Sequence, residues 1–405
     1  MFCSTYRRAA LSALAAICLA VTAAGGAGAA PEPVPLTAIL PLTGTFAFAG
    51  QSQRDGLEVL ADYINKTGGI QGRPLQMKFF DDQSSPQISV QLVNNVIAGG
   101  AQLLLGGAGA AQCRATAPLV AQTGPVLYCI SPAVKPDAGS YVFSSGVQPR
   151  DELMAALHFF RDKGWTKIAF LATNDASGQE ADDNFNAIVK LPENAAIHVV
   201  AYEHYAPSDI NVGAQIARIK AAQPDALVIW AAGQPIATAF HGMHDAGLDV
   251  PVITSFAMQE YSAMDQFASI LPTHLYFASS KWPAYDIMTP GPVRDQLATF
   301  FAAFKAKNIQ PDAGEQLAWD PGLILIDSLR KLGANAKAAQ IRAYIESQHA
   351  LAGTSGIYDF STGDQRGLGL NDVVLSEWTP AKRAWIAVSD AGGAALRPNE
   401  KISGR

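Results

Sequence analysis

Hydrophobic residues follow two alternating patterns along this 405-residue chain from residue 36 onward. Short, mostly apolar runs are typical of buried strands. They alternate with longer segments whose apolar residues recur at helical spacing. Leu57, Leu60, Ala61 and Ile64 form one such helical face. Strands that alternate with helices in this way predict an α/β fold, in which a parallel sheet is covered by helices on both faces.

The alternation forms two successive units, joined by an extended segment near residues 145–149. We therefore predict two α/β sheets in series. In the first unit the predicted strands are 36–40, 75–80, 102–105 and 126–130, and the predicted helices are 51–65, 87–98 and 111–121. In the second unit the predicted strands are 167–172, 197–202, 226–230, 250–254 and 274–277, and the predicted helices are 151–163, 180–189, 212–221 and 235–246.

Beyond residue 277 the pattern changes to a Pro-rich segment followed by helices without intervening strands. Such helices cannot build another strand–helix–strand unit, so we predict that they return to cover the first sheet. No repeat of about 20–50 residues is present, which argues against a solenoid. The predicted late helices are 293–307, 316–331 and 336–348, and strand-like segments follow at 356–360, 371–378 and 383–388.

The N-terminal segment has the features of a cleaved signal peptide. Arg7 and Arg8 give it a positive start, and the apolar run 9–24 is shorter than the roughly 20 residues that a membrane span needs. Small residues directly before Ala30 offer a cleavage site. We therefore assign residues 1–29 to the signal peptide and expect an exported mature chain.

Two alternatives to cleavage are an uncleaved membrane anchor and a lipoprotein attached through Cys18. The short apolar run argues against the anchor. Ile17 is larger than the residue that a lipid-attachment site requires before its cysteine. No later segment approaches the roughly 20 apolar residues of a spanning helix, so we expect no membrane span in the mature chain.

Charge and cysteine usage narrow the possible functions. The formal net charge is −6, and removal of Arg7 and Arg8 with the signal leaves about −8 with no basic runs. Nucleic-acid binding needs clustered Lys and Arg, so it is disfavoured. Of the four cysteines, Cys113 and Cys129 remain after cleavage. They form either a disulfide, as an oxidising compartment allows, or two small buried residues that never meet.

Several motifs resemble one known family. The first predicted strand continues into Pro-Leu-Thr-Gly ("LTAILPLTG"), the next helix ends in "INKTGGIQGR", and the second strand continues into "DDQSSP". Further along are "YCISPAV" at 128–134 and "AWDPGLILIDSLRK" at 318–331. In this order, the motifs resemble the type I periplasmic binding proteins of ABC importers. The branched-chain amino-acid group of that family, which includes members that bind aromatic acids, is the most similar.

The resemblance implies an α/β fold of two Rossmann-like lobes with parallel sheets, joined by three crossover segments. The lobes would close on a small ligand and deliver it to the membrane permease of an ABC importer. The resemblance also implies a periplasmic monomer without cofactor or catalytic activity. We expect the first lobe to comprise 30–147 and 282–360, and the second to comprise 148–281 and 361–405.

In such sheets, ligands bind beyond the carboxyl ends of the strands, near helix N-termini. The family places an aromatic wall after the first strand, which implies Phe48, with Phe46 beside it. Core packing is the alternative for these rings. The next candidate is the loop 106–112, whose Gly-x-Gly resembles a phosphate-binding fingerprint. Gln112 stands where that fingerprint needs Gly or Ala, and the loop does not follow the first strand, so we reject a dinucleotide site.

Backbone N–H groups at a helix N-terminus attract an anion without any side-chain charge. Family members commonly have a Ser in this loop that meets the ligand carboxylate, whereas this chain has only Gly and Ala. We therefore expect the backbone here to bind a ligand carboxylate. The candidate residues are Ala108, Gly109, Ala110 and Ala111.

The other loops supply the remaining candidates. Family members often have a Thr near Val134 that contacts the ligand, and this chain lacks its hydroxyl. An acid near Phe256 typically pairs with the α-ammonium group in amino-acid binders, but Ser, Phe, Ala and Met fill that space and Glu260 comes later. The full set of candidates from these loops is Ala133, Val134, Ser177, Gln234, Phe256 and Met258.

A buried ammonium group without a partner costs several kcal/mol. Phe46, Phe48, Phe256 and Met258, with Trp282, instead predict an aromatic or apolar carboxylate of the benzoate or phenylpropenoate type. The alternative is that Glu260 or Asp175 supplies the charge, in which case the ligand is a branched-chain or other hydrophobic amino acid. We interpret Glu152 and Asp175 as helix N-terminal or exposed acids.

Other functions are less well supported. His241 and His244 share a helical spacing that can bind a metal, but no third ligand or HExxH motif accompanies them. No nucleophile–base set is visible, which disfavours an exported α/β enzyme. A sensor subunit that presents its ligand to a membrane protein is a further alternative, and the sequence does not separate it from a transport receptor.

Overall fold

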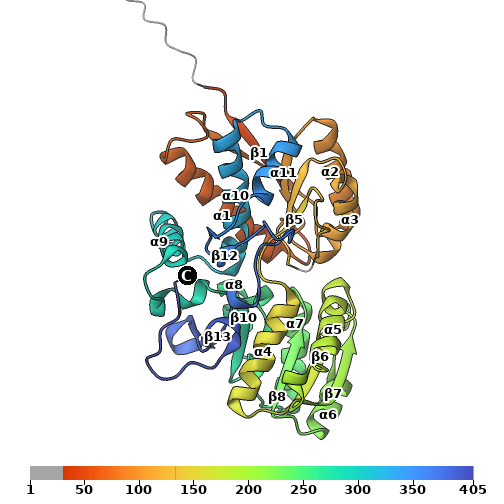
Figure 1. The fold of residues 1–405 in the computed structure, drawn as a ribbon. Coiled ribbons are helices and arrows are strands. Elements are labelled where there is room, and N and C mark those ends of the chain that lie inside the picture. The colour runs from red at the N-terminus through yellow and green to blue at the C-terminus, as the bar shows by residue number, and fades with distance from the viewer. Residues whose placement is uncertain (1–30, 133, 405) are drawn as a thin grey trace, which may run out of the picture.

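The protein, described here by a computed structural model over residues 31–132 and 134–404, forms two lobes, one above the other in Figure 1. Each lobe has a central sheet with helices on both faces. The predicted α/β class, with its two mainly parallel sheets, is therefore confirmed. The expected signal peptide, residues 1–29, lies outside the described residues.

The upper sheet has the strand order β2-β1-β3-β4-β5, and every neighbouring pair is parallel. Alternate strand residues face opposite layers: Ala38 packs under α1 and α10, whereas Ile39 packs under α2 and α3. The elements are β1 Val34–Leu40, α1 Ala47–Lys66, β2 Leu75–Asp81, α2 Pro86–Ala98, β3 Leu103–Gly106, α3 Ala110–Val120, β4 Val126–Cys129 and β5 Val142–Ser144.

The lower sheet has the order β14-β13-β10-β9-β8-β6-β7. Its strands β6 to β10 are parallel, but β13 runs antiparallel to β10 and to β14. These two late strands enter from the other lobe and form a hairpin, so no helical crossover makes them parallel. The strands are β6 Lys167–Thr173, β7 His198–Tyr205, β8 Ala226–Trp230, β9 Val252–Ser255, β10 Leu275–Ser280, β13 Val373–Thr379 and β14 Ala384–Ala387.

Helices cover both faces of this sheet as well. Phe159 of α4 and Phe185 of α5 belong to one apolar layer, and Ile216 of α6 and Phe240 of α7 belong to the other. The short helix α8 was not predicted, because its few residues give too little periodicity. The helices are α4 Pro149–Lys163, α5 Ala176–Ile188, α6 Gly213–Ala221, α7 Pro235–Ala246 and α8 Tyr261–Gln266.

The late helices return to the upper lobe, where α10 packs along α1 and α11 packs against α10 and β4. Asp320 of α10 is 2% exposed and accepts hydrogen bonds from the backbone N–H groups of Thr354 and Ser355 and from the Tyr358 hydroxyl. These bonds tie the small β11–β12 hairpin to the lobe. The elements are α9 Pro292–Lys305, α10 Ala313–Leu332, α11 Ala338–Glu346, β11 Leu351–Ala352 and β12 Ile357–Tyr358.

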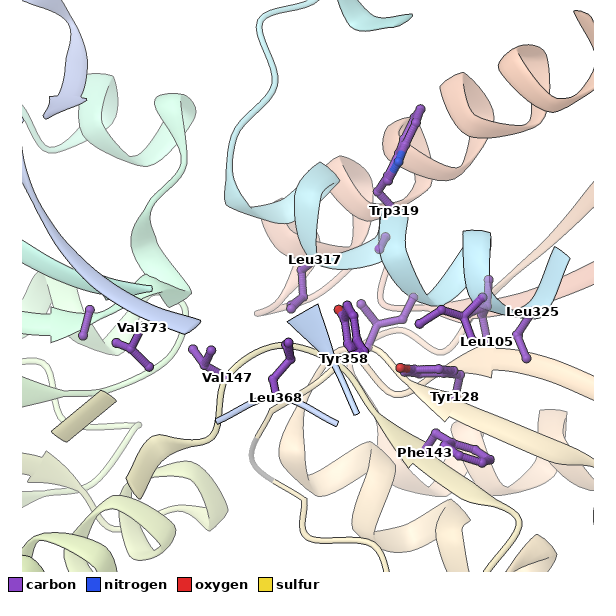
Figure 2. Packing of buried hydrophobic residues seen from close by; sticks show 14 of the residues in the cluster. Leu105, Tyr128, Phe143, Val147, Leu317, Trp319, Leu325, Tyr358, Leu368 and Val373 are labelled. Atoms are coloured by element: carbon purple, nitrogen blue, oxygen red, sulfur yellow. The ribbon is translucent and has the colours of Figure 1, made fainter. Parts of the chain in front are cut away.

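The chain passes between the lobes three times: after β5, after β10 and after β12. The crossovers contribute to the core, because Val147 and Leu368 lie between Tyr358 of the upper lobe and Val373 of the lower lobe (Figure 2). Arg366, on the third crossover, is buried and donates a 2.6 Å hydrogen bond to the Val134 carbonyl. The predicted crossovers are thus confirmed. The exact lobe boundaries stay a prediction.

Cys113 and Cys129 form a disulfide with a Cα–Cα distance of 6.0 Å. It joins the first turns of α3 to the end of β4, directly beneath two of the loops expected to hold ligand. Of the two alternatives that the sequence left open, the structure therefore has the bonded pair. No helix within 31–132 and 134–404 is both long and apolar enough to cross a membrane.

Replacing Cys113 and Cys129 together by Ala should destabilise the upper lobe. The bond closes a loop with a sequence separation of 16 residues, and removing a cross-link of that length costs about 3 kcal/mol of unfolding free energy. Urea unfolding followed by circular dichroism measures the change. Reducing the wild-type protein should have the same effect as the double variant, and equal unfolding midpoints for all samples would contradict the prediction.

Candidate ligand-binding site

A cavity of about 250 Å³ lies where the two lobes face each other. Its walls come from the loops after β1, β3 and β4 of the upper sheet and after β6, β8 and β9 of the lower sheet. Except for the loop after β4, which leads to β5, these carboxyl-end loops lead into helix N-termini, which are the usual ligand-binding positions. The first residues of α4 and α10 complete the lining.

The loop after β1 is held by the segment after β2. The Asp81 carboxylate accepts hydrogen bonds from the Leu42 backbone N–H (2.9 Å) and from the Thr43 hydroxyl (2.7 Å). The Ser84 hydroxyl donates to the Thr43 carbonyl (2.8 Å) and accepts from the Phe46 backbone N–H (3.1 Å). The Asp-Asp-Gln-x-x-Pro motif therefore fixes the backbone that carries the aromatic wall.

The N-terminus of α3 forms the amide-rich part of the wall. Gly109 precedes the helix in an extended conformation and has no side chain to cap it. Since the first N–H groups of a helix have no partner within the helix, those of the first turn at Ala110 and Ala111 are available at the cavity. This is an anion-binding arrangement built from backbone alone.

Apolar side chains from both lobes form most of the remaining surface. They include Phe46, Phe48, Trp230, Phe256, Met258 and Leu317.

The lobes also touch directly beside the cavity. A Cβ atom on Gly233 of the lower lobe would lie 3.1 Å from the Thr45 carbonyl oxygen and 3.7 Å from the Phe46 ring. On α3 and α5, Arg114 and Glu180 form a 2.7 Å ion pair between the lobes. These contacts describe a conformation in which the lobes touch beside a cavity that is still partly open.

Three acidic residues line the cavity, namely Glu152, Asp175 and Glu260, and none of the described lining residues is Lys, Arg or His. Asp175 caps α5: its Oδ1 accepts hydrogen bonds from the Gly178 backbone N–H (2.9 Å) and the Thr173 hydroxyl (3.0 Å). Asp175 is thus a helix N-terminal acid, as the sequence suggested, and its charge already has partners.

Glu260 is only 4% exposed. Burial raises the pKa of its carboxyl group well above the usual range, and the neighbouring Asp312 carboxylate raises it further. Asp312 is occupied by capping α10 and by accepting from the Tyr261 backbone N–H. The expectation that this loop lacks an acid is wrong. The 3-10 turn Phe256–Met258 shortens the chain path and brings Glu260 back to the cavity wall.

Glu152 is 1% exposed, and neither of its carboxyl oxygens has a hydrogen-bonding partner. Burial raises the pKa of this carboxyl group well above its usual range, although the Arg366 guanidinium and the Phe256 backbone amide favour the charged form. Of the two interpretations of Glu152, helix N-terminal or exposed, the structure supports the first and not the second. Glu152 lies in the first turn of α4, but faces inward.

The structure brings most of the predicted site residues together at this cavity. Ala133 lies outside the described residues. The following predicted residues line the cavity: Phe46, Phe48, Ala108, Gly109, Ala110, Ala111, Ser177, Phe256 and Met258.

Three predicted residues lie elsewhere. Val134 is buried in the apolar layer under α2 and α3, and its carbonyl oxygen accepts from Arg366. Gln234 is exposed at the start of α7, while its neighbour Gly233 reaches the cavity. Trp282 packs against Trp385 at a ring distance of 5.7 Å in the lower lobe.

Sequence reasoning missed several lining residues. Trp230 ends β8, so its place at a strand's carboxyl end was a usable signal. Gln53 follows on α1 one turn beyond the aromatic loop, which is a weaker signal. Leu317 comes from a helix far along the chain, and no local pattern indicates that it reaches the ligand cavity.

Comparisons with known proteins agree with this architecture. The family model described as periplasmic binding protein matches residues 33–383. A Leu/Ile/Val-binding protein homologue of Brucella melitensis is 24% identical over 367 residues, which cover 87% of this chain and 94% of that protein.

Two solved structures have the same fold. One is the substrate-binding protein of a branched-chain amino acid transporter from Streptococcus pneumoniae with isoleucine (TM-score 0.73, 18% identity, 88% of this chain and 99% of that one). The other is a Rhodopseudomonas palustris solute-binding protein with benzoate (TM-score 0.74, 18% identity, 92% and 99%). The chain therefore belongs to the periplasmic binding protein family, as a type I member of its branched-chain amino-acid group.

Proposed function

We propose that this receptor binds an α-amino acid with a largely apolar side chain, and that Glu260 pairs with the ligand's ammonium group. The observation that carries the proposal is a buried carboxyl group on the cavity wall, among described lining residues that include no basic side chain. A carboxylate in such a place is costly unless a cation joins it. The cation that fits is one the ligand brings.

The other end of an amino acid fits the N-terminus of α3. Free backbone N–H groups and the positive end of the helix dipole stabilise a carboxylate without any Arg or Lys. The ligand carboxylate would thus lie at the N-terminus of α3, and its ammonium group would lie at Glu260. Because the cavity lies between the lobes and has a mainly apolar lining, each of these interactions is stronger than it would be in solution.

The apolar lining determines the rest of the ligand. Phe46 and Phe48 from the upper lobe and Phe256 and Met258 from the lower lobe offer surface for an aliphatic or aromatic side chain. A cavity of about 250 Å³ has room for one small molecule of this kind. Leu/Ile/Val-binding relatives and the isoleucine complex support the same ligand class.

A second candidate is the aromatic or apolar carboxylate of the benzoate or phenylpropenoate type that the sequence predicts. The ring-rich lining and the benzoate complex of a protein with the same fold favour it. For such a ligand Glu260 must be protonated and neutral. Burial, which raises the pKa of Glu260, makes that form available.

Proteins of this family bind small ligands and work with ABC permeases, which implies a periplasmic location. For this chain we infer capture of the ligand between the lobes, presentation of the closed form to a permease, and no chemical change of the ligand. Closure about the crossovers is the step that would make the bound and free forms differ in shape.

Calorimetric titration with leucine, phenylalanine and benzoate tests the ligand class. We expect the amino acids to bind the wild type. Glu260→Gln should lose about 2–5 kcal/mol of binding free energy, because a charge in a buried pair is removed. Glu193→Gln, at an exposed glutamate of the same lobe, is the matched control. Binding of benzoate with no response to either amino acid would favour the second candidate instead.

Phe48→Ala should weaken binding while the fold is kept. Loss of the ring removes apolar contact worth about 1.5–3 kcal/mol when fully buried, so the dissociation constant should rise at least tenfold. The control is Phe80→Ala, since Phe80 is 42% exposed on β2 and away from the cavity. Equal affinities of Phe48→Ala and wild type would remove Phe48 from the ligand wall.

Protein stability without ligand should depend on pH through Glu260. Its pKa is raised from 4.5 in the folded state, so its stabilising contribution is complete below about pH 4.5 and is lost as pH rises through the raised pKa. Amino-acid affinity should rise over the same pH interval, because binding an ammonium group requires the carboxylate. Melting curves of wild type and Glu260→Gln, with and without leucine, should diverge there. Parallel curves would contradict the assignment.

A further inference from the structure

The cavity contains a second buried acid that the proposed pairing with the α-ammonium group does not use. Glu152 lines the cavity, is 1% exposed, and neither carboxyl oxygen accepts a hydrogen bond of normal geometry; the Phe256 backbone amide lowers its pKa without making such a bond. It lies in the first turn of α4, immediately after the first crossover. Buried polar groups in proteins are nearly always hydrogen-bonded, so these orphaned oxygens need an explanation.

The surroundings of Glu152 differ from those of Glu260. Arg366 and Asp151 are the charged residues that act on Glu152, whereas Asp312 acts on Glu260. Arg366 does not neutralise Glu152 by pairing with it, because its guanidinium donates to the carbonyl oxygens of Val134 (2.6 Å) and Gly146 (3.5 Å). The two glutamates are therefore separate buried acceptors among the lining residues of the cavity.

A third acceptor lies on the upper lobe. Gln53 of α1 is 1% exposed, lines the cavity and has no partner for its Oε1 atom. Glu152 and Gln53 are thus two unsatisfied acceptors in a cavity whose surface is otherwise mainly apolar. A purely aliphatic ligand would leave both without a hydrogen bond, which costs free energy because both side chains are buried.

We propose that Glu152 determines specificity by accepting a hydrogen bond from a donor on the ligand's side chain. The preferred ligand is then an amino acid with an apolar body and one hydroxyl, phenol, indole or amine donor. This inference rests on the proposed amino-acid function and refines it. Sites built to hydrogen-bond a ligand group discriminate strongly against the analogue that lacks the group, because the protein's own acceptor is then left unpaired.

Matched ligand pairs that differ by one donor test this assignment. We choose phenylalanine with tyrosine, and norvaline with 5-hydroxynorvaline, titrated calorimetrically into the wild type. In at least one pair the donor-bearing member should bind about tenfold tighter, as one net hydrogen bond to a buried acceptor provides. Glu152→Leu should reduce that ratio to about one, and Glu152→Gln, which keeps an acceptor oxygen, should restore part of it.

The outcomes separate this inference from the proposed function. If amino acids bind the wild type but neither pair shows a preference, the role of Glu152 is refuted while the receptor's ligand class stands. A structural role for Glu152 predicts that Glu152→Leu weakens every ligand by the same factor, and that result also refutes it. If no amino acid binds the wild type, both proposals fail. Should Glu152→Leu not fold, the wild-type ratio and Glu152→Gln decide.

Discussion

The parallel strands of each sheet, β1 to β5 and β6 to β10, have their carboxyl ends at one edge, and the crossovers turn those two edges toward each other. The ligand cavity is a consequence of that constraint. Most loops that leave these edges lead into a helix N-terminus, so the walls are rich in free backbone N–H groups. An anion can therefore be held at α3 without a single basic side chain among the described lining residues.

The same arrangement also places two acidic side chains where their charged forms are unfavourable. Glu260 and Glu152 reach an enclosed, mainly apolar space from two different helix starts, and burial opposes their ionisation. In water-filled open lobes each carboxyl group would be solvated. In the enclosed form each needs a partner, so closure and ligand chemistry depend on each other. Asp175 shows the contrast, because its Oδ1 atom already accepts hydrogen bonds from Gly178 and Thr173.

Much of the fold could be predicted from the sequence. Apolar periodicity predicted the strands and long helices, since each repeats its signal over several turns or pleats. The antiparallel edge formed by β13 and β14 was not predicted, because strand direction depends on where the chain re-enters. The helix α8 was missed for lack of length.

The site was less predictable than the fold, and for physical reasons. In the sequence, Glu260 lies too far along the loop after β9 to be expected at the cavity. A single 3-10 turn in that loop changes which residue faces inward. Glu152 looks like any acid in a first helical turn, and only tertiary packing directs it to the cavity. Leu317 belongs to a helix whose placement depends on the return of the chain to the upper lobe. Local patterns contain none of this information.

Arg366 has a consequence for how long a captured ligand stays. Its guanidinium group donates hydrogen bonds to the carbonyl oxygens of Val134 and Gly146. These bonds link the third crossover to the part of the chain at the first crossover. While these hydrogen bonds persist, the first and third crossovers cannot twist independently. Opening of the lobes must therefore either bend the two crossovers together or break the buried hydrogen bonds of Arg366. If the lobes open about these crossovers, we expect the lifetime of a bound ligand to depend on hydrogen bonds of Arg366, which is not among the lining residues of the cavity.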